Sequence, residues 1–187
     1  MECEPGMTKH IETLIDSFYN RNSMITKEQL TAGMTHECDV CSHLFTKLSP
    51  ESYSYRPTPQ QRSTIELMKY LAVCGIAGIR SLVEGNYSAF AEGRERLKDM
   101  APEDFPAEME KQKAEIMAYM ANLDDETLRT LEVKTPAGQV LPLGAAIIYG
   151  PFKWLSSYKM QLFLYAKATG ASEIGTANAW AGMDWKG

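Results

Sequence analysis

Apolar residues recur at intervals of three and four along most of this chain, which is the pattern of amphipathic helices. The first set lies within residues 8–20 and consists of Ile11, Leu14, Ile15 and Phe18. A second helix is predicted from Thr26 to about Leu48, because Gln29 stands three residues after Thr26 in a capping-box pattern. The chain therefore opens with two predicted helices.

The most apolar segment, residues 64–84, is predicted to be the central helix, with Ser63 or Thr64 as its cap. Its apolar content is too high for one face, so other elements should cover most of its surface. Gly75 and Gly78 lie inside this segment, where each lowers helix stability by about 1 kcal/mol relative to Ala. Close approach by another helix is the expected reason for both glycines.

The remaining sequence predicts two polar amphipathic helices, a hairpin and a last long helix. The two helices lie within 86–100 and 102–122, and alternation on either side of the turn 135–138 indicates a small β-hairpin. The last helix lies within 143–169 and contains Pro151, which must either kink it or begin its main part. The predicted fold class is therefore all-α.

The chain of 187 residues suits one domain of usual size and is too short for two by default. We therefore treat 1–187 as a single domain, with its core at about 26–170 and a C-terminal tail at 171–187. Trp180 and Trp185 are large apolar rings in an otherwise small, polar tail. They are expected to dock the tail onto the helices, because solvent-exposed indoles are unfavourable.

Charge and composition limit the partners. The formal net charge is −5, and basic residues such as Arg94, Arg96 and Lys98 stand among acids, which argues against nucleic acid. The longest apolar run, 71–79, is far shorter than the roughly 20 residues that span a bilayer, and the start lacks a signal-peptide pattern. We therefore expect a soluble cytoplasmic protein with no membrane partner, whose cysteines stay reduced.

The segment from His36 to His43 gathers two histidines and two cysteines and suggests a metal site. On a helix, however, Cys38 and Cys41 fall on the apolar stripe and the histidines on the opposite side, so one ion cannot reach all four. Buried thiols and exposed histidines are the expected outcome. A redox or metal role for the Cys38-x-x-Cys41 pair is the alternative, although the strand-to-helix context of a thioredoxin-type site is missing.

Several enzyme motifs are absent from the sequence. No histidine follows a glutamate by three residues, which excludes the di-iron carboxylate bundle. There is also no Gly-x-Ser-x-Gly, no Gly-x-x-x-x-Gly-Lys and no Gly-x-Gly-x-x-Gly. The common hydrolase, phosphate-binding and dinucleotide-binding sites are therefore not expected.

Two stretches resemble the DinB-like family. The first is Leu48-Ser-Pro-Glu-Ser-Tyr-Ser-Tyr-Arg-Pro-Thr-Pro59 followed by Arg62-Ser-Thr-Ile-Glu-Leu-Met-Lys-Tyr-Leu71, and the second is Leu141-Pro-Leu-Gly144 followed by Tyr158-Lys-Met-Gln-Leu162. The resemblance covers about 26–170. It implies an up-down-down-up four-helix bundle, to which this chain adds an extra N-terminal helix, a small β-hairpin and a docked C-terminal tail.

Members of that family commonly bind a divalent metal through one histidine on the second bundle helix and two, four residues apart, on the last. The resemblance places Tyr70, Trp154 and Tyr158 at these positions. Indole offers only an N–H donor, and a phenol is protonated at neutral pH, so neither is a good ligand. The resemblance therefore implies that the usual metal centre is lost, and no metal or cofactor is expected.

A pocket in place of the metal centre would combine aromatic and polar side chains, a composition typical of small-molecule sites. Its members are Trp154, Tyr158 and Gln161 on the last helix and Glu66 and Tyr70 on the central helix, with Tyr165 and Cys74 beside them. The favoured interpretation is that the rings fill the core at the place where the family holds metal and water. Lys153 and Lys159 are expected on the solvated edge of the last helix.

We derive two hypotheses for function. The first is a non-catalytic, metal-free DinB-like bundle, in one copy or as a homodimer, that binds a small apolar ligand or a protein partner. The second is an enzyme related to the metal-dependent thiol transferases that this superfamily resembles, with catalysis moved to Cys38, Cys41 or Cys74. The second requires a reactive thiolate or a bound metal, and the first requires neither.

Overall fold

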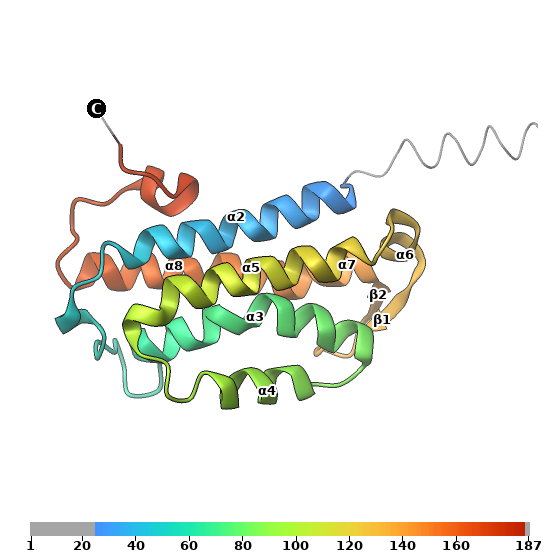
Figure 1. The fold of residues 1–187 in the computed structure, drawn as a ribbon, viewed down its shortest axis with the longest axis horizontal. Helices are drawn as coiled ribbons and strands as arrows, with labels where there is room; N and C mark the ends of the chain where they lie inside the picture. Colours follow the sequence, from blue (N-terminus) through green and yellow to red (C-terminus); the bar gives the residue numbers. More distant parts are fainter. Residues whose placement is uncertain (1–24, 186–187) are drawn as a thin grey trace, which may run out of the picture.

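Four long helices build the body of the protein in a computed structural model that describes residues 25–185 (Figure 1). They are α2 (Lys27–Phe45), α3 (Thr64–Glu84), α5 (Phe105–Ala121) and α8 (Lys153–Ala168). In Figure 1, α2 and α8 run in one direction and α3 and α5 in the other. Both α5 and α8 contact α2 on one side and α3 on the other. The predicted up-down-down-up bundle is therefore confirmed.

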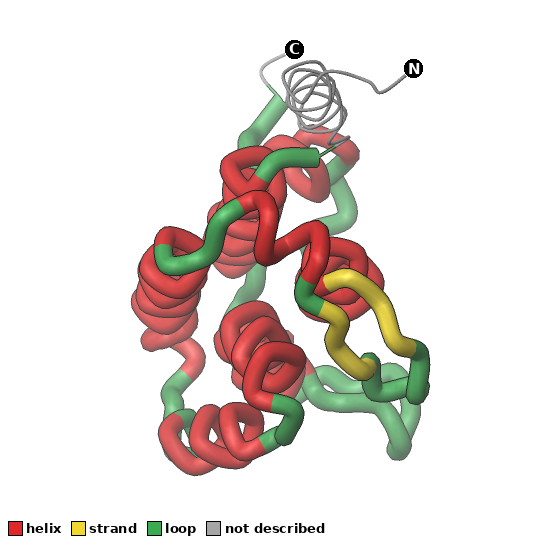
Figure 2. The backbone as a smooth tube through the Cα atoms, turned by 90° about the vertical axis from the view of Figure 1, so that its right-hand side faces the viewer, coloured by secondary structure: helices red, strands yellow, loops and turns green. Residues whose placement is uncertain are grey.

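The smaller elements connect these helices. They are α4 (Ser88–Arg96), α6 (Asp125–Thr130), β1 (Glu132–Lys134), β2 (Val140–Pro142) and α7 (Leu143–Ile147). The helix α4 packs along α3 and leads the chain back to the start of α5 (Figure 1). The strands pair antiparallel with Val133 opposite Leu141, and Figure 2 shows them beside the helices, which are seen end-on. The hairpin was predicted, whereas the short helix α6 was not.

Local capping fixes where the first two bundle helices begin. The Thr26 hydroxyl accepts a hydrogen bond from the Gln29 N–H, and the Gln29 side chain accepts one from the Thr26 N–H. Ser63 and Glu66 exchange the same pair of bonds at the start of α3. These are two complete capping boxes, which satisfy N–H groups that a helix start leaves free.

The helix ends also follow from local chemistry. The α-helix α2 ends at Phe45, three residues before the predicted end, and tighter turns continue the chain to Leu48. Gly85 ends α3 with a left-handed φ of 69°, a conformation that glycine adopts without a steric penalty. Pro151 lies in a π-helical turn, Ile148–Phe152, that joins α7 to α8. The wider turn accommodates a residue that has no N–H to donate.

The centre of the bundle is held by one buried amide, that of Gln112 on α5. Its Oε1 accepts a hydrogen bond from the Gly75 N–H at 2.9 Å, and its Nε2 donates to the Leu71 carbonyl at 2.8 Å. In a regular α-helix these two backbone groups are each other's partners. A Cβ on Gly75 would lie 2.8 Å from Leu155 Cδ1 and 3.1 Å from Gln112 Oε1. The missing side chain therefore lets α5 and α8 approach α3 together.

Two further expectations concern the first predicted helix and the membrane. The helix predicted within 8–20 lies outside the described residues. Within residues 25–185, the helices are all too short or too polar to cross a bilayer.

We predict that Gly75→Ala lowers the free energy of unfolding by about 1 to 3 kcal/mol, because the added methyl overpacks the contact with Leu155 and Gln112. Alanine is otherwise the better helix former, so local propensity alone predicts stabilisation. Gly175→Ala is the control, since a Cβ there meets no atom within 4 Å. Urea unfolding followed by circular dichroism measures both, and a Gly75→Ala protein as stable as wild type would contradict the close approach.

Candidate functional site

The aromatic side chains expected at the site form a cluster between α3, α4 and α8. The rings of Tyr70 and Tyr158 meet edge-on with centroids 4.8 Å apart. Phe90 of α4 lies parallel to Tyr70 at 6.4 Å and meets Trp154 at 6.0 Å. The guanidinium carbon of Arg62 lies 4.3 Å from the Tyr70 centroid and 5.3 Å from that of Tyr158. The space between the two phenols is thus filled by their own contact.

A pocket of about 320 Å³ lies on the other side of Tyr70, between α3 and α4. Its apolar lining includes Tyr70 and Phe90, and its charged lining consists of Arg62, Glu66, Lys69 and Arg94. We call this the Tyr70 pocket. It contains two of the residues expected in the aromatic pocket, Tyr70 and Glu66. The sequence pattern did not single out Arg62, Lys69 or Arg94 as site residues.

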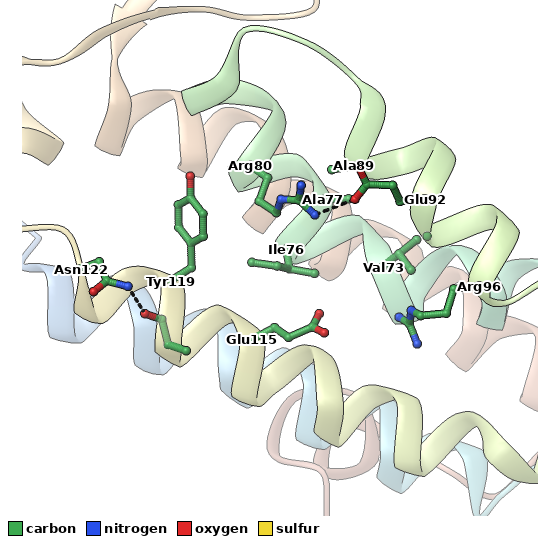
Figure 3. A pocket seen from close by; sticks show the side chains of 12 residues that line it. Val73, Ile76, Ala77, Arg80, Ala89, Glu92, Arg96, Glu115, Tyr119 and Asn122 are labelled. Carbon is green, nitrogen blue, oxygen red and sulfur yellow. Dashed lines mark hydrogen bonds and ion pairs between the residues drawn. The ribbon is translucent and has the colours of Figure 1, made fainter.

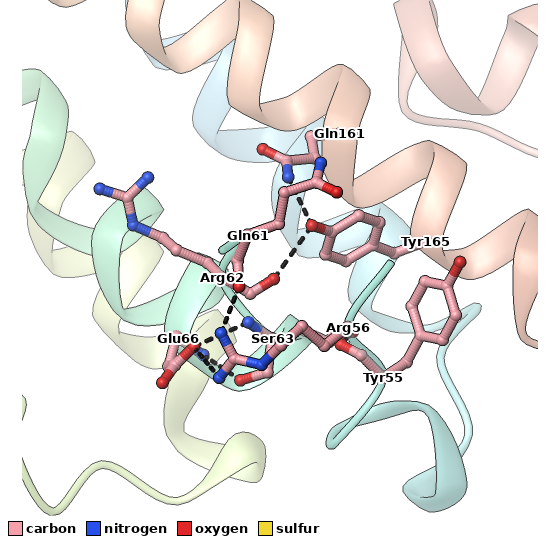
Figure 4. Close-up of polar contacts among 9 residues, drawn as sticks. Tyr55, Arg56, Gln61, Arg62, Ser63, Glu66, Gln161 and Tyr165 are labelled. Carbon is pink, nitrogen blue, oxygen red and sulfur yellow. Dashed lines mark hydrogen bonds and ion pairs between the residues drawn. The ribbon is translucent and has the colours of Figure 1, made fainter. Parts of the chain in front are cut away.

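Two other expected site residues lie elsewhere. Trp154 lines a separate hollow of about 260 Å³ next to the hairpin, together with the exposed Tyr149. Gln161 donates a hydrogen bond to the Tyr165 hydroxyl, which in turn donates to the Arg62 carbonyl at 3.0 Å (Figure 4). Tyr165, held by Gln161, therefore joins α8 to Arg62, the residue just before the Ser63 cap of α3.

Glu66 is already engaged by the backbone and by an arginine outside the pocket. Its Oε2 accepts hydrogen bonds from the Ser63 N–H at 2.7 Å and from Arg56 at 2.6 Å (Figure 4). The bond from the Ser63 backbone is the main reason why the pKa of Glu66 lies below its usual value. The carboxylate stays ionised at neutral pH, and its charge is balanced locally by Arg56.

The three positions that the resemblance assigns to metal ligands hold side chains that do not suit a metal. Tyr70 and Tyr158 are phenols, and burial raises the pKa of Tyr70 further above its ordinary value, so its oxygen stays protonated. Trp154 offers no lone pair on its ring nitrogen. Across residues 25–185, His, Cys, Asp and Glu side chains do not gather in a group of three or more that could hold an ion. The residues present therefore do not fit the divalent metal that the resemblance implies.

The cysteines considered as reactive thiols, Cys38, Cys41 and Cys74, are all buried and unpaired. Burial raises the pKa of Cys38 to about 12, and it raises the pKa values of Cys41 and Cys74 well above the usual range. Gln112 Nε2 lies 3.8 Å from Cys38 Sγ, as a buried polar neighbour. Enclosed, protonated thiols are poor nucleophiles.

We predict that iodoacetamide at pH 7.5 modifies Cys38, Cys41 and Cys74 far more slowly in native protein than in protein unfolded in urea, because these thiols are buried and protonated. Mass spectrometry of the separate peptides measures each rate. Native labelling of any of the three as fast as in the unfolded chain would support the enzyme hypothesis.

The prediction that Lys159 lies on the solvated edge of α8 was wrong, whereas Lys153 is exposed as expected. Lys159 is only 1% exposed, and its Nζ lies 2.7 Å from Glu37 Oε2. Its position four residues after Leu155 and three before Leu162 is core spacing, which could have indicated the burial. The pair joins α8 to α2.

The histidines contact the C-terminal tail, so the prediction of two exposed histidines was wrong for His43, which is half-buried. His36 Nε2 lies 2.7 Å from the Trp180 carbonyl, and His43 Nε2 lies 3.1 Å from Asn178 Nδ2. Polar side chains of helix α2 thus contact the tail. The sequence could not show this, because the partners lie more than 130 positions away.

The tail is docked as predicted, but its two indole rings remain largely exposed to solvent. Trp180 is 56% exposed and Trp185 is 81% exposed, whereas Ile174, Asn178 and Ala179 are buried. The Trp180 ring does lie over the ammonium of Lys159, 5.0 Å from its centroid. Trp180 therefore covers the ammonium of Lys159, while Ile174, Asn178 and Ala179 make the buried contacts of the tail.

Deleting residues 171–187 should lower the melting temperature by several degrees, because Ile174 and Asn178 lose their buried contacts and the ion pair is uncovered. Trp185→Ala is the control and should leave the melting curve unchanged, since this ring is 81% exposed. Differential scanning calorimetry measures both proteins. A deletion that melts with wild type would show that docking contributes nothing to stability.

The helix arrangement defines a class, that of up-down-down-up four-helix bundles. The crystal structure of a DinB-like protein, YjoA, from Bacillus subtilis matches with a TM-score of 0.63 at 22% identity, covering 79% of this chain and 96% of that one. A DinB-family structure from Exiguobacterium sibiricum matches with a TM-score of 0.60 at 18% identity, covering 81% and 96%. No family model and no curated protein matches the sequence. The chain therefore has the DinB-like fold.

Proposed function

We propose that this chain is a single-domain, metal-free DinB-like bundle that binds a small organic molecule in the Tyr70 pocket and does not catalyse a reaction. The observation that carries the proposal is the pocket itself, about 320 Å³ with an aromatic floor and several charged groups converging on it. This volume lies within the range of small-molecule sites, roughly 300 to 1,000 Å³. The ligand would rest on Tyr70 and Phe90.

The chemistry of the surrounding residues supports binding over catalysis. The positions that the resemblance assigns to metal ligands hold Tyr70, Trp154 and Tyr158, none of which suits a divalent ion at neutral pH. The buried thiols lack the thiolate character that a thiol-dependent transferase needs, because burial raises their pKa values. Aromatic rings next to charged side chains can bind a ligand without a metal or a thiolate.

The metal-free part of the proposal is tested by elemental analysis. Full-length protein purified without an affinity tag should contain far less than one equivalent of any transition metal. Added zinc or nickel should not raise its melting temperature, because a metal stabilises only a fold that binds it. Stoichiometric zinc or nickel in the purified protein would contradict the proposal.

The location of the site is tested with Phe90→Ala, which removes half of the aromatic floor. Calorimetry measures the affinity for 2-naphthoate and for its neutral amide, and both affinities should fall at least tenfold in this variant. Tyr149→Ala is the matched control, because Tyr149 is an exposed aromatic residue that lines the other hollow. Equal binding by wild type and Phe90→Ala, with both folded by circular dichroism, would place the site elsewhere.

A further inference from the structure

The Tyr70 pocket is lined by three basic side chains from separate segments. Lys69 stands on α3, Arg94 on α4 and Arg62 just before α3. Lys69 Nζ donates a hydrogen bond to the Lys98 carbonyl, which holds the ammonium without neutralising it. Arg62 lies over two tyrosine rings, and Arg94 has no carboxylate partner among residues 25–185. The rim therefore carries positive charge that the protein itself does not pair.

The one acid in the lining cannot balance this charge. Glu66 is occupied by Arg56 and by the Ser63 N–H, and Figure 4 shows the guanidinium of Arg62 directed away from that cluster. The stacking of Arg62 on Tyr70 holds its planar fork in place while leaving its N–H groups free to donate. The pocket is thus locally positive in a chain whose net charge is −5.

The arginines of the neighbouring groove form ion pairs with acidic side chains of the protein. This groove has about 490 Å³ and lies between α4 and α5 (Figure 3). There, Arg80 is paired with Glu92 at 2.9 Å and with Glu84 at 3.0 Å, and Arg96 is paired with Glu108. The arginines of the larger groove are therefore internally satisfied, and those of the Tyr70 pocket are not.

We infer that the ligand of the Tyr70 pocket is an organic anion, a carboxylate or phosphate attached to a small apolar body. Arginine presents paired N–H groups that match the two oxygens of such an anion, and charge-assisted hydrogen bonds of this kind are the strong ones. The apolar body would lie on Tyr70 and Phe90, next to Val73 and Leu97. The inference rests on the proposed function, and it adds the anionic group to the small apolar ligand expected from the sequence.

The charge preference is tested by comparing probes of one shape on the full-length protein. Calorimetric titrations at low salt use 2-naphthoate, 2-naphthyl phosphate, neutral 2-naphthamide and cationic 2-naphthylmethylammonium. Both anions should bind at least tenfold more tightly than the amide, and the cation should bind more weakly than the amide. Raising the salt concentration should weaken the anions and leave the amide unchanged, because ions screen only the charged contact. Comparing the two anions shows whether the rim prefers carboxylate or phosphate.

Arg94→Gln tests the rim directly, and Lys111→Gln is its control because Lys111 is an exposed cation outside the pocket. The first variant should lose about tenfold in affinity for the anions and nothing for the amide, and the second should bind all four probes like wild type. Arg94 is exposed, so its variant should fold normally.

The outcomes separate the two proposals. If the amide binds as tightly as the anions and Phe90→Ala still abolishes binding, the inference of an anionic ligand is overturned and the proposed location of the site stands. Anion binding that Arg94→Gln does not change would also overturn the inference, because the rim would then not be the recognition element. Absence of binding for all four probes, or binding that Phe90→Ala does not weaken, would overturn the proposed function as well.

Discussion

The aromatic cluster behind the Tyr70 pocket depends on how closely α8 approaches α3, and two glycines of α3 permit that close approach. A Cβ on Gly78 would lie 2.7 Å from Pro151 Cγ and 2.9 Å from Trp154 Cζ3, so α8 can begin where it does only because that atom is missing. Gly75, one turn earlier, admits Leu155 and the Gln112 amide in the same way. Protein interiors have no room for such an extra atom. The contact between Tyr70 and Tyr158 follows, since Tyr158 lies one turn beyond Trp154.

The two sides of α8 serve different purposes. One side turns Trp154 and Tyr158 toward α3 and α4, where their rings meet Tyr70 and Phe90. The other side places Lys159 against Glu37 of α2, beneath the tail. A buried ion pair adds little net stability, but removing one partner leaves an unpaired charge in the interior. The pair therefore favours one seating of α8 against α2, and with it one position for the aromatic side.

A fold shared with DinB-like structures does not assign an activity, because function resides in the site and not in the scaffold. At the positions that the resemblance assigns to metal ligands, this chain holds two phenols and an indole, which are poor ligands for a divalent metal at neutral pH. It has instead a basic rim around an aromatic floor, on the side of Tyr70 that faces α4. The proposed role as a binding protein follows from these residues alone.

Local sequence patterns were sufficient to predict the long helices. The bundle topology was implied by the family resemblance. Periodicity and the Ser63 cap placed α3 at its observed bounds, and the turn at 135–138 predicted the hairpin. These features are local, since each depends on residues within one or two turns of each other. The short helix α6 lies below the length at which a periodic pattern can be recognised.

The faces that pack against one another are evident only in the folded bundle. The bundle buries Lys159, turns His43 toward the tail and brings Arg94 of α4 to the same pocket as Arg62. A helical pattern shows which residues share a face, but it does not name the partner of that face. Each of these contacts joins segments far apart in the chain, so its energy appears only when the bundle has closed.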